Sequence, residues 1–206
     1  MFRACCFNAG DWEKALEYAA REREIAARLH SRERQSWTYL VTAFSYMASG
    51  DLEAAERELR EGKALAESIG EQRLELLLKG NLAIVLANRG RIDEAFQHAR
   101  ENFTASEALG LLYTRGEGRR SLAHVHFMAG ELDEAVRLCD EVLEILGNAK
   151  SRVCRLWMGP LHIEALFLSG RREEASHRLS EYELLVSDSQ APRCEREVAR
   201  LRKLLD

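Results

Sequence analysis

The sequence predicts an all-α superhelix, a solenoid of about five antiparallel helix-pair repeats. The first observation is a glycine that recurs every 40 residues, at Gly10, Gly50, Gly90, Gly130 and Gly170. The second is the spacing of apolar residues between these glycines, which follows the period of amphipathic helices. The third is the composition, in which glutamate, arginine, leucine and alanine dominate and only two prolines occur. Such a composition favours long helices over strands.

Each glycine is expected to form a tight corner between two helices. It precedes a polar residue and then an acidic run, as in residues 50–55 (GDLEAA) and 130–135 (GELDEA). Glycine readily takes the left-handed conformation that ends a helix. Acidic residues in the next first turn complement that helix's dipole. The 40-residue unit therefore contains one helix on each side of the corner.

A second break follows about twenty residues after each corner, consistent with two helices per repeat. These breaks fall at Leu29-His30, Ile69-Gly70, Leu109-Gly110 and Leu146-Gly147. The helices after the corners are expected near 11–29, 51–68, 91–108, 131–146 and 171–187. The helices before the corners are expected near 32–49, 71–89, 111–129 and 151–169. Pro192 opens a capping helix over 192–205, so residues 1–206 are read as a single repeat domain.

The helices must stack on one another to bury their apolar faces. Within 51–68, one stripe recurs at three-, four- and seven-residue steps, formed by Leu52, Ala55, Leu59, Ala66 and Ile69. A lone helix cannot bury such a stripe. Small residues also flank the corners twelve apart, in the pairs Ala43/Ala55, Ala83/Ala95 and Ala123/Ala135. Short side chains there let the two helices of a repeat approach closely.

Two segments depart from the regular pattern. Only Met1 to Ala9 precede Gly10, where about eighteen residues are expected for a helix of the array. The chain is therefore expected to be a piece of a longer protein, or to form a homodimer that covers an open N-terminal end. In the last repeat, Gly159-Pro160 predicts a kinked helix or a late helix start. This pair is either relaxed geometry at an array end or a ligand-gated hinge.

The corner glycines and flanking alanines resemble the tetratricopeptide repeat family over nearly the whole chain. A large residue is expected early in the first helix of each repeat, where Tyr39 fits but Lys79 and Arg119 do not. The proline that usually closes the repeat is absent. The 40-residue length looks like the longer-helix variant of bacterial multidomain regulators, including maltose-type ATP-dependent transcription activators.

The resemblance implies that the first helix of each repeat lines a concave groove. The groove residues carried over from it are Trp37, Phe44, Met47, Asn81, Ile84, Asn88, Arg120, His124, Phe127, Trp157, Leu161 and Glu164. A groove with aromatic residues and an arginine suits a peptide or protein segment, and predicts a non-catalytic interaction scaffold. The alternative is a small-molecule effector-sensing module of a bacterial transcription or signalling regulator. For Trp37, Phe44 and Trp157, simple packing between adjacent first helices is the competing interpretation.

Two specialised anion sites are not predicted. The family's clamp for a peptide carboxylate requires cations together with asparagine, and Phe44 and His124 stand at the matching positions beside Asn81 and Asn88. The run at 115–120 (RGEGRR) lacks the G-K-[ST] of a nucleotide loop. Its arginines are expected to pair with glutamates on an exposed helix face.

Several function classes are excluded by what the sequence lacks. The six histidines form no H-E-x-x-H and no i, i+4 pair, and the five cysteines form no C-x-x-C. No catalytic residue, cofactor site or metal site is therefore predicted. A net charge of −4 with interleaved signs argues against direct nucleic-acid or membrane binding. No apolar run is long enough to span a bilayer, and the protein is expected to be cytoplasmic.

Overall fold

The computed structural model describes residues 11–147, 152–187 and 192–205, which contain ten α-helices and no strand. Gly10 and the N-terminal residues for which an open end is predicted lie outside these residues. Every described helix lies within one residue of its predicted bounds at each end. The helices are α2 (Trp12–Arg28), α3 (Arg32–Ser49), α4 (Leu52–Ser68), α5 (Gln72–Asn88), α6 (Ile92–Leu109), α7 (Leu112–Met128), α8 (Leu132–Gly147), α9 (Arg152–Leu168), α10 (Arg172–Ser187) and α11 (Pro192–Leu205).

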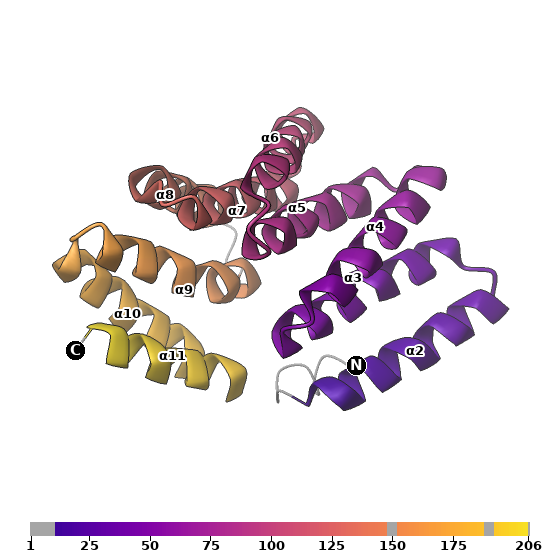
Figure 1. The fold of residues 1–206 in the computed structure, drawn as a ribbon, viewed down its shortest axis with the longest axis horizontal. Coiled ribbons are helices and arrows are strands. Elements are labelled where there is room, and N and C mark those ends of the chain that lie inside the picture. The colour runs from indigo at the N-terminus through magenta and orange to yellow at the C-terminus, as the bar shows by residue number, and fades with distance from the viewer. Residues whose placement is uncertain (1–10, 148–151, 188–191, 206) are drawn as a thin grey trace.

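The helices stack in chain order along an arch (Figure 1). Each packs against the helices before and after it in the sequence, and α5 also packs against α7. The helices before the corners (α3, α5, α7 and α9) lie on the inside of the arch, and we call them the inner helices. The helices α4, α6, α8 and α10 lie outside. This arrangement confirms the predicted solenoid of helix pairs.

The corners form as the sequence predicts. All four described corner glycines have left-handed backbone, with φ between 78° and 87°. At one corner the Asp51 side chain accepts a hydrogen bond from the Ala54 N–H at 2.9 Å, which caps α4.

Three of the four second breaks also turn through positive φ, at Gly70 and Gly110, and at His30 with φ of 53°. Histidine tolerates this region better than most residues, so the break survives there without glycine. The fourth, at Leu146-Gly147, leads into residues 148–151, which lie outside the described residues.

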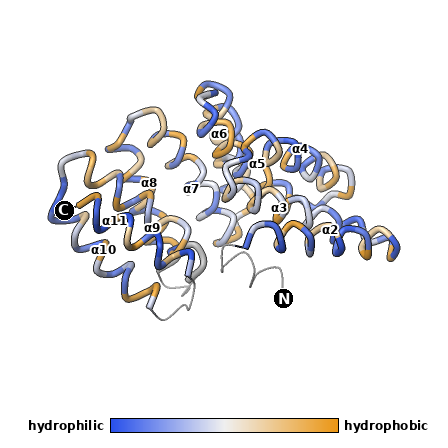
Figure 2. The backbone as a smooth tube through the Cα atoms, turned by 60° about the horizontal axis from the view of Figure 1, so that its bottom comes forward, coloured by the Kyte–Doolittle hydropathy of each residue, from blue (hydrophilic) through white to orange (hydrophobic). Residues whose placement is uncertain are grey.

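The core lies between inner and outer helices. The six alanines that flank the corners in pairs are fully buried, as their spacing predicts. Helix α5 is surrounded most completely, with twelve of its 17 residues buried. Toward the C-terminal end, hydrophilic and hydrophobic residues alternate with each turn of α9, α10 and α11 (Figure 2). Their apolar sides form a second core cluster that includes Val198 and Leu201 of α11.

Helix α9 runs from Arg152 to Leu168 through Pro160, so the predicted late start is wrong. The preceding Gly159 leaves room for the Tyr182 ring, because a Cβ there would lie 2.5 Å from Tyr182 Cδ2. A proline at position 160 has no N–H to donate to the carbonyl of Leu156. The Tyr182 hydroxyl donates to that carbonyl instead, at 3.2 Å. Tyr182 of α10 therefore packs against α9 at the Gly159-Pro160 pair.

Within the described residues, no helix is both long enough and apolar enough to cross a membrane.

Candidate functional site

Helices α5 and α7 bring two predicted groove residues into direct contact. Arg120 donates from Nη2 to Asn81 Oδ1 at 3.1 Å and from Nε to Glu117 Oε2 at 2.9 Å. The Asn81 amide in turn donates to the Leu77 carbonyl of its own helix. Asn81 lies nine residues before Gly90, and Arg120 lies ten residues before Gly130. The two side chains therefore start from nearly equivalent positions along α5 and α7. The guanidinium charge of Arg120 is balanced by the carboxylate of Glu117.

A second polar contact lies further along the same two helices. His124 Nε2 is 2.8 Å from Oδ1 of the exposed Asn88. Burial and the nearby Arg120 charge lower the pKa of His124 to about 4. The imidazole is therefore neutral at physiological pH, and its Nε2–H donates to the Asn88 oxygen. We call Asn81, Asn88, Arg120 and His124 the polar network.

The two ends of the predicted groove meet each other. The Phe44 ring of α3 and the Trp157 ring of α9 have centroids 5.2 Å apart and an interplanar angle of 34°. The competing interpretation placed these aromatics between adjacent inner helices, whereas this contact joins the second repeat to the fifth. The guanidinium of Arg193, from α11, lies 4.4 Å from the Trp157 ring centroid. Concave positions far apart in sequence thus share one aromatic contact.

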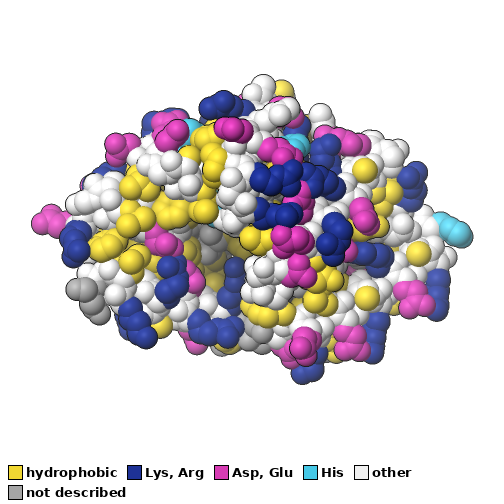
Figure 3. Space-filling model, viewed as in Figure 1, with side chains coloured by type: hydrophobic (Ala, Val, Ile, Leu, Met, Phe, Trp, Pro, Cys, Tyr) yellow, Lys and Arg dark blue, Asp and Glu magenta, His cyan; other side chains and the backbone are white. Residues whose placement is uncertain are grey.

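The remaining predicted residues differ in how much of them a partner could reach. Ile84 and Asn81 are only 3% and 2% exposed, so a partner could reach little of either side chain. Glu164 is half-buried and accepts a hydrogen bond from Arg200 of α11. Side chains that are half-buried and pack against the two core clusters are Trp37, Met47, Phe127 and Leu161. On one face, hydrophobic side chains border a hollow at the centre of the arch (Figure 3).

The arginine-rich run at the start of α7 forms ion pairs, as predicted. Arg115 Nε donates to Glu107 Oε1 at 3.1 Å, and Arg119 also donates to Glu107. Arg119 Nε reaches Glu141 Oε2 of α8 at 2.9 Å. The predicted exposure is wrong for Arg119, which is 8% exposed and has its guanidinium 5.0 Å from the Phe103 ring centroid. It fills the position where the family resemblance led us to expect a large residue.

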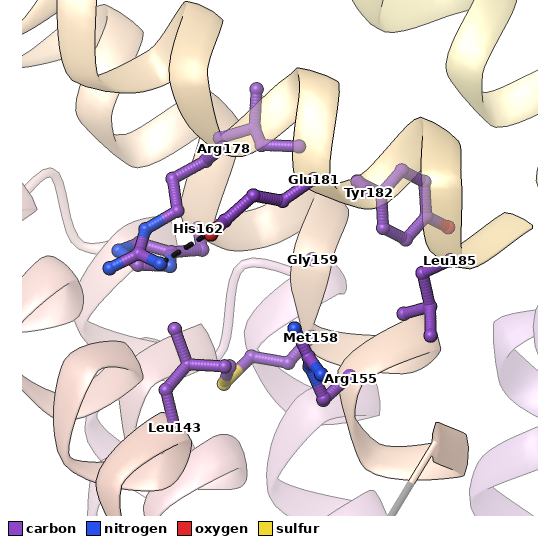
Figure 4. Close-up of a pocket in the computed structure, with 10 residues that line it drawn as sticks. Leu143, Arg155, Met158, Gly159, His162, Arg178, Glu181, Tyr182 and Leu185 are labelled. Carbon is purple, nitrogen blue, oxygen red and sulfur yellow. Dashed lines mark hydrogen bonds and ion pairs between the residues drawn. The ribbon is translucent and has the colours of Figure 1, made fainter. Parts of the chain in front are cut away.

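Sequence reasoning missed a small hollow between α8, α9 and α10 (Figure 4). Its walls include His162 and the ion pair of Arg178 with Glu181, which are 2.9 Å apart. His162 is 3% exposed, and its Nε2 lies 3.3 Å from Asp140 Oδ1. The free space is about 40 Å³, which accommodates a few waters but no metabolite. The signal in the sequence was a histidine at a position where two other repeats carry leucine.

Among the described side chains, no group of three or more His, Cys, Asp or Glu residues is placed to hold a metal ion.

The comparisons with known proteins agree with this geometry. Tetratricopeptide repeat family models match residues 77–109 and 119–147, and a second such model matches residues 36–61. These matches cover repeats two to four and support the tetratricopeptide repeat family. No curated protein sequence matches the chain.

Solved structures show the same fold at low sequence identity. A protein of Podosopora anserina, described as a kinesin light chain with nearly identical TPR-like repeats, is 20% identical with a TM-score of 0.57, over 92% of this chain and 93% of that one. BtubC from P. vanneervenii is 14% identical with a TM-score of 0.63, over 91% and 78%. A Rap protein complexed with Competence and Sporulation Factor is 14% identical with a TM-score of 0.65, over 98% and 62%. The fold is therefore a tetratricopeptide-like solenoid.

Proposed function

We propose that the protein is a non-catalytic interaction scaffold whose concave face binds a peptide or protein segment. The observation that carries the proposal is the polar network, in which two hydrogen-bonded pairs, Asn81 with Arg120 and Asn88 with His124, join the adjacent inner helices α5 and α7. Apolar rings stand on both sides of it in the repeat order, from Phe44 in α3 to Trp157 in α9. Binding sites commonly combine a few oriented polar groups with such aromatic anchors.

The charge balance of the site favours an uncharged polar guest such as a peptide backbone. Arg120 is neutralised by Glu117, and His124 is neutral because its pKa is about 4. A carboxamide such as that of the exposed Asn88 offers both a donor and an acceptor, which complement the C=O and N–H of an extended chain. One neighbour of this fold, the Rap protein, was solved with a bound factor.

The setting we propose is the cytoplasm, as one repeat domain of a longer bacterial transcription or signalling regulator. A small-molecule effector is the alternative guest, and self-association through the N-terminal end is a further one. The hollow between α8, α9 and α10 is too small for an effector. A groove of about 680 Å³ between α10 and α11 is large enough for one, so an effector has two candidate places, this groove and the concave residues.

A selected peptide ligand tests the proposal. Peptides are selected on the chain from a display library, and their affinities are measured by calorimetry. Asn88→Ala and His124→Ala are each expected to weaken binding about five- to tenfold, the worth of one hydrogen bond in a partly buried site. The matched control is Gln97→Ala, which removes an exposed amide from the outer helix α6 and should change nothing.

Two results would contradict the proposal. Selected peptides that bind the Asn88 and His124 variants as tightly as the unmodified chain would place the site elsewhere. If no peptide binds, while a metabolite raises the melting temperature in a thermal screen, the effector alternative replaces the scaffold.

A further inference from the structure

Three side chains from distant parts of the chain meet at one place on the concave side. Phe44 of α3 lies against Trp157 of α9, with ring centroids 5.2 Å apart, and Arg193 of α11 lies 4.4 Å from the Trp157 ring centroid. All three are half-buried. We call Phe44, Trp157 and Arg193 the clasp. It joins the second repeat to the fifth and to the terminal helix.

Helix α11 holds the inner surface of α9 at two points. Besides Arg193 at Trp157, Arg200 donates a hydrogen bond to Glu164, seven residues further along α9. The apolar side of α11 anchors it through Val198 and Leu201, which are buried in the core cluster of the last repeats. Both arginines therefore act from a fixed helix onto two predicted guest-contact residues.

The turn of α9 that carries Trp157 is weakly tied to the rest of its helix. Pro160 cannot donate to the Leu156 carbonyl, so one backbone hydrogen bond of the helix is missing directly beside Trp157. The Leu156 carbonyl is bound by the Tyr182 hydroxyl of α10 instead. Prolines are among the few identifiable causes of bending in helices. Moving this turn therefore breaks fewer backbone hydrogen bonds of the helix than moving a turn in which all of these bonds are formed.

We propose that the clasp closes the concave face between repeats two and five, and that a guest segment binds after the clasp opens. In the closed state Phe44 and Trp157 each cover part of the other ring, which reduces the aromatic surface that a guest can contact. This gating rests on the function proposed above, whereas the closure itself does not. The apparent affinity for a guest is reduced in proportion to the fraction of closed molecules. Weakening the clasp should therefore strengthen binding, the reverse of removing a guest contact.

The first part of the experiment measures closure without any guest. Trp12→Phe and Trp37→Phe leave Trp157 as the sole tryptophan of the chain's three. In this background, Arg193→Met removes the cation but keeps a long side chain. Acrylamide quenching of Trp157 fluorescence is expected to rise about two- to threefold, because loss of the cation–π contact favours the open clasp, in which the ring is more exposed. The matched control is Arg202→Met on the same helix, whose guanidinium bonds Glu183 of α10.

A second variant guards against misfolding of the first. Phe44→Leu removes the other ring of the clasp and should raise quenching in the same way, with unchanged helical circular dichroism. Quenching equal to that of Arg202→Met in both variants would overturn the closure.

The second part measures the affinity of a display-selected peptide. Arg193→Met is expected to bind about two- to tenfold more tightly than the unmodified chain, whereas Arg202→Met is unchanged. If Arg193→Met raises the quenching of Trp157 but leaves the peptide affinity unchanged, Arg193 only shields the ring. That result would overturn the gating. If no peptide can be selected, the proposed function fails, while the quenching measurement still decides whether the clasp closes the array.

Discussion

In both the second and the fifth repeat, a tyrosine on one helix packs against a glycine on the other, but the helix that carries the tyrosine differs. In the second repeat the ring belongs to the inner helix, and a Cβ on Gly62 of α4 would lie 2.5 Å from Tyr39 Cβ. In the fifth repeat the ring belongs to the outer helix, and a Cβ on Gly159 of α9 would lie 2.5 Å from Tyr182 Cδ2. Both pairs are 23 residues apart in the sequence. The interface thus requires one ring and one gap, but either helix can supply the ring.

The exchange has different consequences for the two inner helices. Helix α3 keeps its own ring, over which the Arg23 guanidinium lies 4.0 Å from the Tyr39 ring centroid. Helix α9 has a glycine followed by a proline and depends on α10 for the hydrogen bond to Leu156. At Leu156, helix α9 is therefore held by a side chain of α10 and not by its own backbone. We assign this turn of α9 as the part of the clasp that moves.

Removal of either ring should give the largest effect. Tyr182→Ala is expected to destabilise the protein by about 3–5 kcal/mol, because it deletes a buried ring and the donor to Leu156. Tyr39→Ala should cost less, since Tyr39 is only half-buried. Urea denaturation of both variants measures the difference. Equal losses would show that the two rings are interchangeable in energy as well as in position.

Filling the gap is the next largest test. Gly62→Ala should destabilise by about 1–3 kcal/mol despite alanine's better helix propensity, because the new methyl overlaps Tyr39 Cβ. Tyr39→Ala retains that Cβ and should not rescue it. Gly159→Ala meets the Tyr182 ring instead, so Tyr182→Ala should rescue it. Double-mutant cycles on thermal stability check both, and the same coupling in both repeats would refute the exchange.

The fifth repeat should also be more sensitive to acid than the second. Burial lowers the pKa of His162 to about 4, whereas the second repeat has Thr42 at that position. The unfolded histidine binds its proton near pH 6.5, so stability falls as the pH drops from about 6.5 towards 4. We expect a loss of about 1–2 kcal/mol, because Asp140 on α8 favours the charged form while Arg178 on α10 opposes it.

The pH dependence has a natural control. His162→Leu installs the residue that repeats three and four carry at this position, and it should reduce the loss of stability between pH 6.5 and 4, leaving the part due to His124. The exposed His177, changed to Gln, should leave the profile as it is. A profile unaffected by His162→Leu would assign the acid sensitivity to another group.

The smallest effect concerns a single hydroxyl. Tyr182→Phe should cost about 1 kcal/mol, because the Leu156 carbonyl loses its donor. In a Pro160→Ala background the helix supplies its own N–H, so the same change should cost less. Chemical denaturation of the four proteins gives the coupling. Additive effects would mean that the tyrosine does not replace the bond that proline removes.

Periodicity predicted the fold almost completely, because the 40-residue glycine spacing and the paired alanines are local, repeated signals. The family resemblance predicted Asn81 and Arg120 as groove residues, and that role stays a prediction. Periodicity could not reveal that Phe44 meets Trp157, because that contact depends on how the curvature accumulates over three repeats. The role of Gly159 was hidden for another reason: its partner Tyr182 stands on the other helix, and only comparison with Tyr39 and Gly62 exposes the exchange.

Hydrogen exchange on the complex with a selected peptide tests the central claim most directly. The account predicts slower exchange along the inner helices α5 and α7 near Asn88 and His124, with a change in the turn of α9 that carries Trp157. Protection confined to the outer helices α4, α6 and α8 would contradict a concave binding face.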